Sequence, residues 1–502
     1  MHLLKLRWLY LPVLCTIVTA LIFAQGSNNS VQSWPPDTTG YSRVALPDDQ
    51  GYVYDETEGI VRDVVVSNTD PNLKNTDSFN DGETSIAIDP ENPNHIVISA
   101  FSGGWGATAP IWHSLDGGNT WAKRFTVPIP PGVTSAVGCP CDQTFDYGHS
   151  GRLSAAFLST VPTDVYTATT FHPEAIPAWM WFLLGGVTQR TNLTGIGMAD
   201  QPWLLVNRDP VAHRDNVYVA YDNFSGAPDM RVSVANLTDA DPADFTTDRL
   251  TGFSTGFVNP GHRLAIDRKT GFVYSLFQRR IAPGAGGSQN IDYMLNRSTD
   301  GGNSWSLNGS ATGIVVANGD STQPTPKFGT VNALLGGVLH AATNPNHGGV
   351  VYYVYGNRDA VTGNNRLSLR RLESDASGNL SVVLTSFVTG QVQAALPSVA
   401  VAENGTVGVF YYTFNGFSAG FPVFSAHLSQ SQDNGATFSD QVLETFLSSA
   451  ADNANARQRV LGDYVQMKAI GNTFYGAFTG NGVPFGRPFS NHDPIFFKVA
   501  AY

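Results

Sequence analysis

Charged residues and cysteines are both scarce in this 502-residue chain. Asp, Glu, Lys and Arg make up 14% of it, and their balance gives a formal net charge of -12. An acidic surface argues against a nucleic-acid partner and against binding to anionic membranes. Of three cysteines, Cys139 and Cys141 stand one residue apart, and the two further soft ligands that a zinc site needs are not nearby. A local disulfide or a structural thiol pair is therefore favoured over a redox site.

Long apolar runs are absent beyond the N-terminus. There, Lys5 and Arg7 precede an apolar stretch at 8–23 that ends in small residues. A basic start, a short apolar run and a small exit residue are typical of a secretory signal peptide, and the run is short for a membrane anchor, which is the alternative. We expect 1–24 to be a signal peptide and 25–58 a flexible leader. The mature protein is then expected to be extracellular, unattached to a membrane, and monomeric.

A long helical pattern is missing as well, and a repeated pair of apolar strands fills the chain instead. The first copy pairs residues 85–89 with 96–101, and the seventh pairs 465–468 with 473–478. β-Branched and aromatic residues around turns of Gly, Asn, Asp and Pro are typical of hairpins. Seven such copies at intervals of about 55 to 80 residues indicate radial repetition.

These repeats predict an all-β fold with one domain over residues 59–502. We expect a single seven-bladed β-propeller, with six blades as the alternative. The segment 59–67 is expected to add a strand to the last blade and close the ring.

A second motif, Ser-x-Asp-x-Gly-x-Thr/Ser-aromatic, occurs at 114–121, 298–305 and, slightly degraded, at 431–438. Its aromatic residues are separated by three and then two units of about 60 to 65 residues, which agrees with the hairpin count and assigns the motifs to repeats one, four and six. Asp and Ser accept backbone N–H bonds in tight turns, Gly permits a positive φ angle, and the aromatic ring anchors the hairpin. We interpret the motif as a structural turn without catalytic chemistry.

This motif resembles the Asp box, or bacterial neuraminidase (BNR) repeat, of sialidase-like propellers, and the resemblance extends over about residues 60 to 502. It implies membership of the glycosyl hydrolase/sialidase superfamily, which includes sialidases, other glycosidases, polysaccharide lyases and members of unassigned activity. It also implies that the Asp boxes lie between outer strands, away from the ligand face.

The candidate site follows from propeller geometry, because the innermost strand of each blade starts at the rim of the central channel, where ligands are usually held. The polar residues that open the repeats are Glu83, Asp142, Asp200, His262, Arg263, Asp463 and Tyr464. Repeat five is expected to open at Val331 and Asn332. Facing carboxylates are what glycoside hydrolysis requires, although crowded carboxylates could equally bind calcium. No other cofactor is expected.

Sialidases bind the substrate carboxylate with three arginines and use a tyrosine nucleophile activated by a glutamate. Tyr464 resembles that nucleophile in position, but Glu83 opens the first repeat where sialidases carry an Arg-Ile-Pro motif. Arg263 is the one arginine that is well placed, and one arginine does not give the recognition that three do. True exo-sialidase activity is therefore not expected.

The leading hypothesis is a secreted, glycan-active, hydrolase-like propeller whose substrate is not sialic acid. One alternative is a non-catalytic propeller that binds glycan or protein. Another is a polysaccharide lyase with His262 or Tyr464 as base. Trp105 is left open between stacking on a sugar and filling a blade, whereas Trp179 and Trp181 are expected to be buried.

Overall fold

The computed structural model describes the strands of the fold and most of the turns between them. The described residues are 44–45, 52–54, 59–65, 82–101, 105, 109, 111–124, 127–131, 140–160, 163–175, 178–184, 187–188, 198–224, 229–245, 247–250, 258–283, 289–321, 339–359, 361–388, 393–449, 461–486 and 492–502. The predicted signal peptide at 1–24 lies outside them. Among the described residues, no helix is long and apolar enough to cross a membrane.

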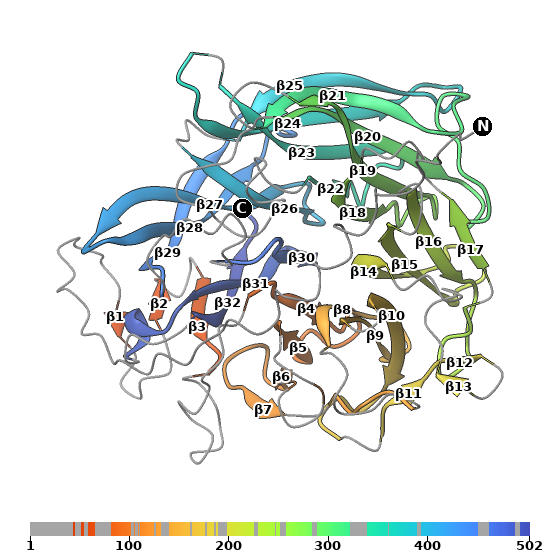
Figure 1. The fold of residues 1–502 in the computed structure, drawn as a ribbon, viewed down its shortest axis with the longest axis horizontal. Helices are drawn as coiled ribbons and strands as arrows, with labels where there is room; N and C mark the ends of the chain where they lie inside the picture. The colour runs from red at the N-terminus through yellow and green to blue at the C-terminus, as the bar shows by residue number, and fades with distance from the viewer. Residues whose placement is uncertain are drawn as a thin grey trace, which may run out of the picture.

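Seven antiparallel sheets surround one axis, and the strands nearest the centre are β4, β8, β14, β18, β22, β26 and β30 (Figure 1). Blade 1 comprises β4 (Ser85–Ile88), β5 (Ile96–Ser99), β6 (Ile111–Ser114) and β7 (Ala122–Arg124). Blade 2 comprises β8 (Cys141–Tyr147), β9 (Leu153–Thr160), β10 (Thr163–Thr170) and β11 (Met180–Trp181). Blade 3 comprises β14 (Ala199–Arg208), β15 (Asp215–Asn223), β16 (Asp229–Ala235) and β17 (Thr247–Leu250). A small hairpin, β12 (Leu183–Leu184) and β13 (Val187–Thr188), lies between blades 2 and 3 in sequence.

Blades 4 to 6 are also four-stranded. Blade 4 comprises β18 (Val258–Ile266), β19 (Val273–Pro283), β20 (Gln289–Ser298) and β21 (Ile314–Ser321). Blade 5 comprises β22 (His340–Thr343), β23 (Val350–Arg358), β24 (Asn365–Ser374) and β25 (Leu380–Phe387). Blade 6 comprises β26 (Ala394–Val401), β27 (Val407–Ser418), β28 (Phe421–Ser431) and β29 (Ser439–Leu447). The count of blades is therefore seven, and the six-bladed alternative is wrong.

Blade 7 joins the two ends of the described chain. It contains β30 (Gln466–Ile470), β31 (Thr473–Asn481) and β32 (His492–Ala500), followed in space by β3 (Gly59–Asp63), β2 (Tyr52–Tyr54) and β1 (Val44–Ala45). β3 pairs antiparallel with β32, with Val61 opposite Phe497, which confirms the predicted closing strand. β1 and β2 extend the same sheet, so strand pairing begins earlier in the chain than residue 59.

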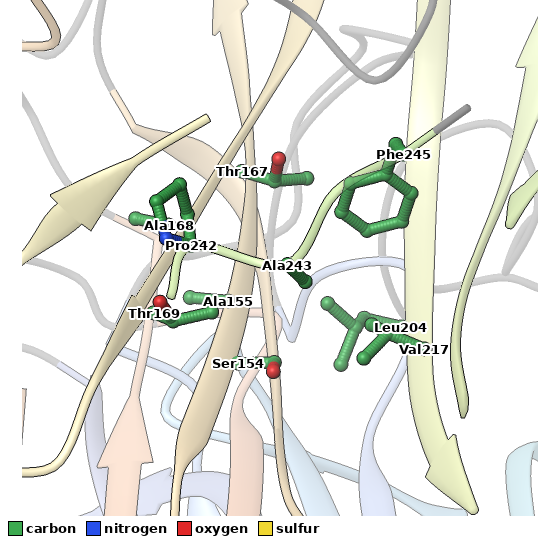
Figure 2. A pocket seen from close by; sticks show the side chains of 10 residues that line it. All are labelled: Ser154, Ala155, Thr167, Ala168, Thr169, Leu204, Val217, Pro242, Ala243 and Phe245. Atoms are coloured by element: carbon green, nitrogen blue, oxygen red, sulfur yellow. The ribbon is translucent and has the colours of Figure 1, made fainter. Parts of the chain in front are cut away.

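The hydrophobic core lies between neighbouring blades. Every residue of β26 is buried, as expected for an inner strand covered on both faces. Phe410 of blade 6 stacks on Phe497 of blade 7 with ring centroids 5.6 Å apart. Figure 2 shows the junction of blades 2 and 3, where Pro242 lies beside Ala168 of blade 2 and Phe245 lies on the side of Leu204 and Val217 of blade 3. The crevice there is too narrow for a water molecule, so the interface is closely packed.

The three repeated turns at 114–121, 298–305 and 431–438 connect the third and fourth strands of blades 1, 4 and 6, as their spacing predicts. In the first turn, the Ser114 hydroxyl donates to Asp116 Oδ1 at 2.7 Å and accepts from the Gly118 N–H at 2.9 Å. Asp116 also accepts from the Thr120 N–H and hydroxyl. The other two turns repeat these bonds. Their carboxylates are thus engaged within the turn itself.

Two local predictions have a definite outcome in the structure. The inner strand of blade 5 is β22, which starts at His340, whereas Val331 and Asn332 lie outside the described residues. The strand was missed because its four residues, His-Ala-Ala-Thr, lack a strong β pattern. Cys141 is disulfide-bonded, and its partner lies outside the described residues.

Candidate axial site

Five of the seven inner strands start with an irregular step at the axis. In five blades the residue at this step has a positive φ: 55° at Glu83, 41° at Asp142, 45° at Gln201, 120° at Gly261 and 57° at Leu396. Four of the five are not glycine, and a left-handed conformation costs an ordinary residue roughly 1 to 2 kcal/mol. The step coincides with a shift in strand register in blades 2, 3, 4 and 6. Such bulges bend a strand and re-aim its side chains.

Two residues further along each inner strand lies an equivalent position that we call the ring position. It is occupied, from blade 1 to blade 7, by Ser85, Thr144, Trp203, Arg263, His340, Ser398 and Gln466. Five of these side chains accept a hydrogen bond of 3.0 to 3.1 Å from a backbone N–H of the next blade. The bonds satisfy buried donors and tie neighbouring blades together. Blades 3 and 4 depart from this pattern.

In those two blades, Trp203 and Arg263 fill the centre of the ring. The guanidinium of Arg263 lies 4.5 Å from the Trp203 ring centre and 5.0 Å from that of Tyr464, which are cation–π distances. It donates to Gln201 Oε1 at 3.0 Å and to the His262 carbonyl at 2.9 Å. Burial lowers the Arg263 pKa, while Tyr464 and nearby carboxyl groups oppose that shift. A buried cation therefore occupies the axis.

Buried acidic groups surround this cation. Gln201 Nε2 donates to Asp463 Oδ2 at 3.3 Å, the Asp463 N–H donates to Glu83 Oε1 at 3.2 Å, and the Tyr464 hydroxyl donates to Asp142 Oδ1 at 3.4 Å. Glu83, Asp142, Asp463 and Tyr464 are each at most 6% exposed. Five of the seven predicted residues, these four and Arg263, thus belong to one network that draws on blades 1, 2, 3, 4 and 7.

Asp200, a sixth predicted residue, stands directly opposite Asp222 in the pairing of β14 with β15. Asp222 is fully buried and accepts the Gly261 N–H at 2.9 Å. Burial, with a smaller contribution from the charge of Asp200, raises the pKa of Asp222 to about 8. The bond from Gly261 and the charge of Arg263 oppose this shift, and the net effect favours the protonated form of Asp222 near neutral pH. Sequence reasoning missed Asp222 because it ends a second strand and does not open a repeat.

His262, the seventh predicted residue, is placed differently. Its imidazole is fully buried between the Tyr221 carbonyl, at 3.3 Å, and the Ser275 hydroxyl, at 2.7 Å. Burial lowers its pKa to about 3, so it is a poor proton acceptor at neutral pH. Of the two bases considered for a polysaccharide lyase, His262 and Tyr464, His262 is therefore the less suitable. His340, at the ring position of blade 5, is likewise held neutral by burial, which lowers its pKa to about 3.

Two other predictions concern the surroundings of the site. Trp105 is 8% exposed and packs edge-on against Phe157 and Trp181, so it fills the space between blades 1 and 2 and does not offer its ring face to a sugar. Trp179 is also buried, as expected, while Trp181 is partly exposed. Over the part of the chain that the structure describes, no three His, Cys, Asp or Glu side chains gather as a metal site would require, and calcium is not shown.

Comparisons with known proteins find similar folds at low identity. No protein-family model and no curated protein matches the chain. Among solved structures, the polysaccharide lyase Uly1 is 11% identical with a TM-score of 0.45, covering 82% of this chain and 88% of its own. An α-L-arabinanase of Penicillium chrysogenum complexed with arabinobiose is 12% identical with a TM-score of 0.43, covering 84% and 96%. The protein is thus a seven-bladed β-propeller with structural neighbours among glycoside hydrolases and polysaccharide lyases, and these identities carry no information about its axial residues.

Proposed function

We propose that this protein is a secreted, glycan-active propeller with a hydrolase-like site at its axis. The observation that carries the proposal is the network of Glu83, Asp142, Asp463, Tyr464 and Arg263 where inner strands from five blades meet. Glycoside hydrolysis needs one carboxyl group that holds a proton and a second group that acts as base or nucleophile. Burial raises the pKa of Asp222 to about 8, which favours a carboxyl group that holds a proton, and the neighbouring carboxyl groups and Tyr464 offer a base or nucleophile.

The roles follow from the contacts. The Tyr464 hydroxyl donates to Asp142, so Asp142 can take its proton as the phenol oxygen attacks the sugar. Asp200 is partly exposed and pairs with Asp222 across the two strands, so we assign this pair the role of general acid, with Asp222 as the group whose raised pKa favours holding the proton. Arg263 is the one arginine that we find in this network of described residues, and one arginine does not give the carboxylate recognition that three do, which supports a substrate other than sialic acid.

A polysaccharide lyase is a second candidate, favoured by one specific contact. The Arg263 guanidinium lies 5.0 Å from the centre of the Tyr464 ring. A lyase needs a base beside a uronate and a positive group that neutralises the uronate carboxylate, and Tyr464 and Arg263 are those two groups. Both reactions release a new reducing end. The sugar on the other side of the cleaved bond is saturated after hydrolysis and unsaturated after the lyase reaction, so analysis of the products separates the two candidates.

The test is a screen of the mature protein against polysaccharides and aryl glycosides, with Asp463→Asn and Tyr464→Phe as variants. We expect turnover by the wild type and a fall in kcat of about 100-fold or more in Tyr464→Phe, because the nucleophile or base is lost. Asp463→Asn should lower kcat by weakening the bond to Gln201 that positions Arg263. Asp433→Asn, in the third repeated turn, is the control and should retain full turnover.

The outcomes separate the candidates. Undiminished turnover in Tyr464→Phe would contradict the proposal that the axial network is the catalytic site. Binding of a glycan that Tyr464→Phe abolishes, without turnover on any substrate, would leave the non-catalytic binding propeller.

A further inference from the structure

A pocket lies at the end of the propeller opposite the axial network. The axial network sits where the inner strands begin, and this pocket lies among turns that follow the ends of the inner strands β22 and β26. Its volume is about 500 Å³. It is lined by Asn344, Asn346, His347, Asn404, Gly405, Thr406, Gln432, Asn434 and Tyr502. Pockets of a few hundred Å³ are of the size that holds small ligands.

The lining has an unusual chemistry for an acidic protein. None of its nine residues is Asp, Glu, Lys or Arg, and five carry a carboxamide. A carboxamide both donates and accepts hydrogen bonds, as a sugar hydroxyl does, so rows of amides complement a neutral, hydroxyl-rich ligand. Tyr502, which is 52% exposed, adds an aromatic ring of the kind that packs against sugar rings.

The walls of the pocket are fixed by bonds between blades. The Asn346 amide donates to the Glu403 carbonyl and so joins blade 5 to blade 6. The Asn404 amide donates to the Ala501 carbonyl at 3.2 Å, and the Thr406 hydroxyl donates to the Tyr502 carbonyl at 2.8 Å, which joins blade 6 to the chain beyond β32. His347 and Gln432 are exposed at the same pocket. A pre-organised wall reduces the entropy that binding costs.

The sequence of the third repeated turn gives independent support. Where the first two turns have Gly117 and Gly301, the third has Asn434 in the left-handed region, with φ 58°. A Cβ at Gly117 or Gly301 would lie 3.1 Å from a neighbouring asparagine oxygen, so glycine suits this turn. The turn itself therefore does not require an asparagine side chain at position 434. That side chain lines the pocket, and its Oδ1 accepts a hydrogen bond of 3.3 Å from the Tyr352 hydroxyl.

We propose that this pocket is a second carbohydrate site that binds a neutral sugar unit of one or two rings. The amides of Gln432 and Asn434 bind its hydroxyl groups, and Tyr502 packs against a ring face. The site is separate from the axial network and does not depend on turnover there.

The experiment is calorimetric titration of the mature protein with arabinobiose, cellobiose and maltose, and with digalacturonic acid as an acidic comparison. The protein is made in a host without N-glycosylation, because Asn404-Gly405-Thr406 is an acceptor sequence. We expect at least one neutral disaccharide to bind. Asn434→Gly and Gln432→Ala should each weaken that binding at least tenfold. Asn434→Gly should leave the melting temperature unchanged or raise it, because it relieves left-handed strain.

Two variants serve as controls. Thr299→Ala changes the equivalent of Gln432 in the turn of blade 4, and Tyr464→Phe changes the axial site, so both should keep wild-type affinity at the second site. The proposal is overturned if no neutral disaccharide binds at about 10 mM, which corresponds to a binding free energy weaker than roughly -3 kcal/mol. The proposal is also overturned if Asn434→Gly binds the neutral disaccharide with wild-type affinity, or if the wild type binds digalacturonic acid as tightly as the neutral disaccharide.

Discussion

At the scale of single residues, the pKa values of two aspartates of this chain are shifted in opposite directions. Asp222 is fully buried at the end of β15, and burial raises its pKa to about 8. Asp433 lies in an exposed turn, where hydrogen bonds from the Thr437 hydroxyl and N–H lower its pKa to about 2. The environment and not the residue type decides which carboxyl group keeps a proton at neutral pH.

Asp222→Asn is predicted to stabilise the protein more at pH 8 than at pH 5. A carboxyl group whose pKa is raised by folding holds more protons in the folded than in the unfolded state between pH 4 and 8. Its contribution to stability is therefore present at low pH and is lost as pH rises through that window. The amide resembles the protonated acid and does not titrate.

Melting temperatures of wild type and Asp222→Asn at pH 5 and pH 8 measure this difference. Asp433→Asn is the control, because the contribution of a depressed carboxyl pKa is lost below pH 4 and is constant from pH 5 to 8. An equal change of melting temperature at both pH values in Asp222→Asn would contradict the prediction.

At the scale of single elements, the inner strands are predictable from sequence, whereas their ring positions are not. Apolar residues on both faces, as in β26, mark a strand packed between sheets. A ring-position residue such as Ser398 accepts a bond from Met467, 69 residues away. No local pattern separates that serine from one in a surface turn. The positive φ angles of Glu83, Asp142 and Leu396 were unpredictable for the same reason, since non-glycine residues avoid that region unless tertiary contacts hold them.

Ser398→Ala is predicted to destabilise the fold by about 1 to 3 kcal/mol, because the buried N–H of Met467 loses its acceptor at 3.0 Å. Ser398→Thr should retain most of the stability, since a threonine hydroxyl performs this role at position 144. The measurement is the midpoint of urea unfolding. Ser377→Ala, in the exposed turn after β24, is the matched control and should change stability by less than about 0.5 kcal/mol. A similar midpoint for both alanine variants would show that the inter-blade bond contributes nothing.

At the scale of the whole molecule, ring closure connects the stability of the fold to its axial site. The sequence predicts the number of blades, the closing strand and the gathering of blade openings at the axis, because repeat spacing and propeller topology determine all three. It does not predict Asp222 or the opening of blade 5, which depend on contacts between distant strands. Asp463 and Glu83 meet across the junction of blades 7 and 1, beside the sheet that β3 completes.

Val61→Pro is therefore predicted to impair both stability and axial function. Val61 is fully buried in β3, between β2 and β32, and proline there removes a donor from the middle of the sheet. Val61→Ala keeps the backbone bonds and should cost about 1 to 3 kcal/mol through lost packing alone, with glycan binding or turnover retained below its melting temperature. Val383→Ala, at an exposed position of β25, should leave both properties unchanged. Thermal unfolding and an assay of glycan binding or turnover on the three variants test this prediction. If Val61→Pro has the same melting temperature and the same binding or turnover as Val61→Ala, closure of the ring by β3 does not support the axial site.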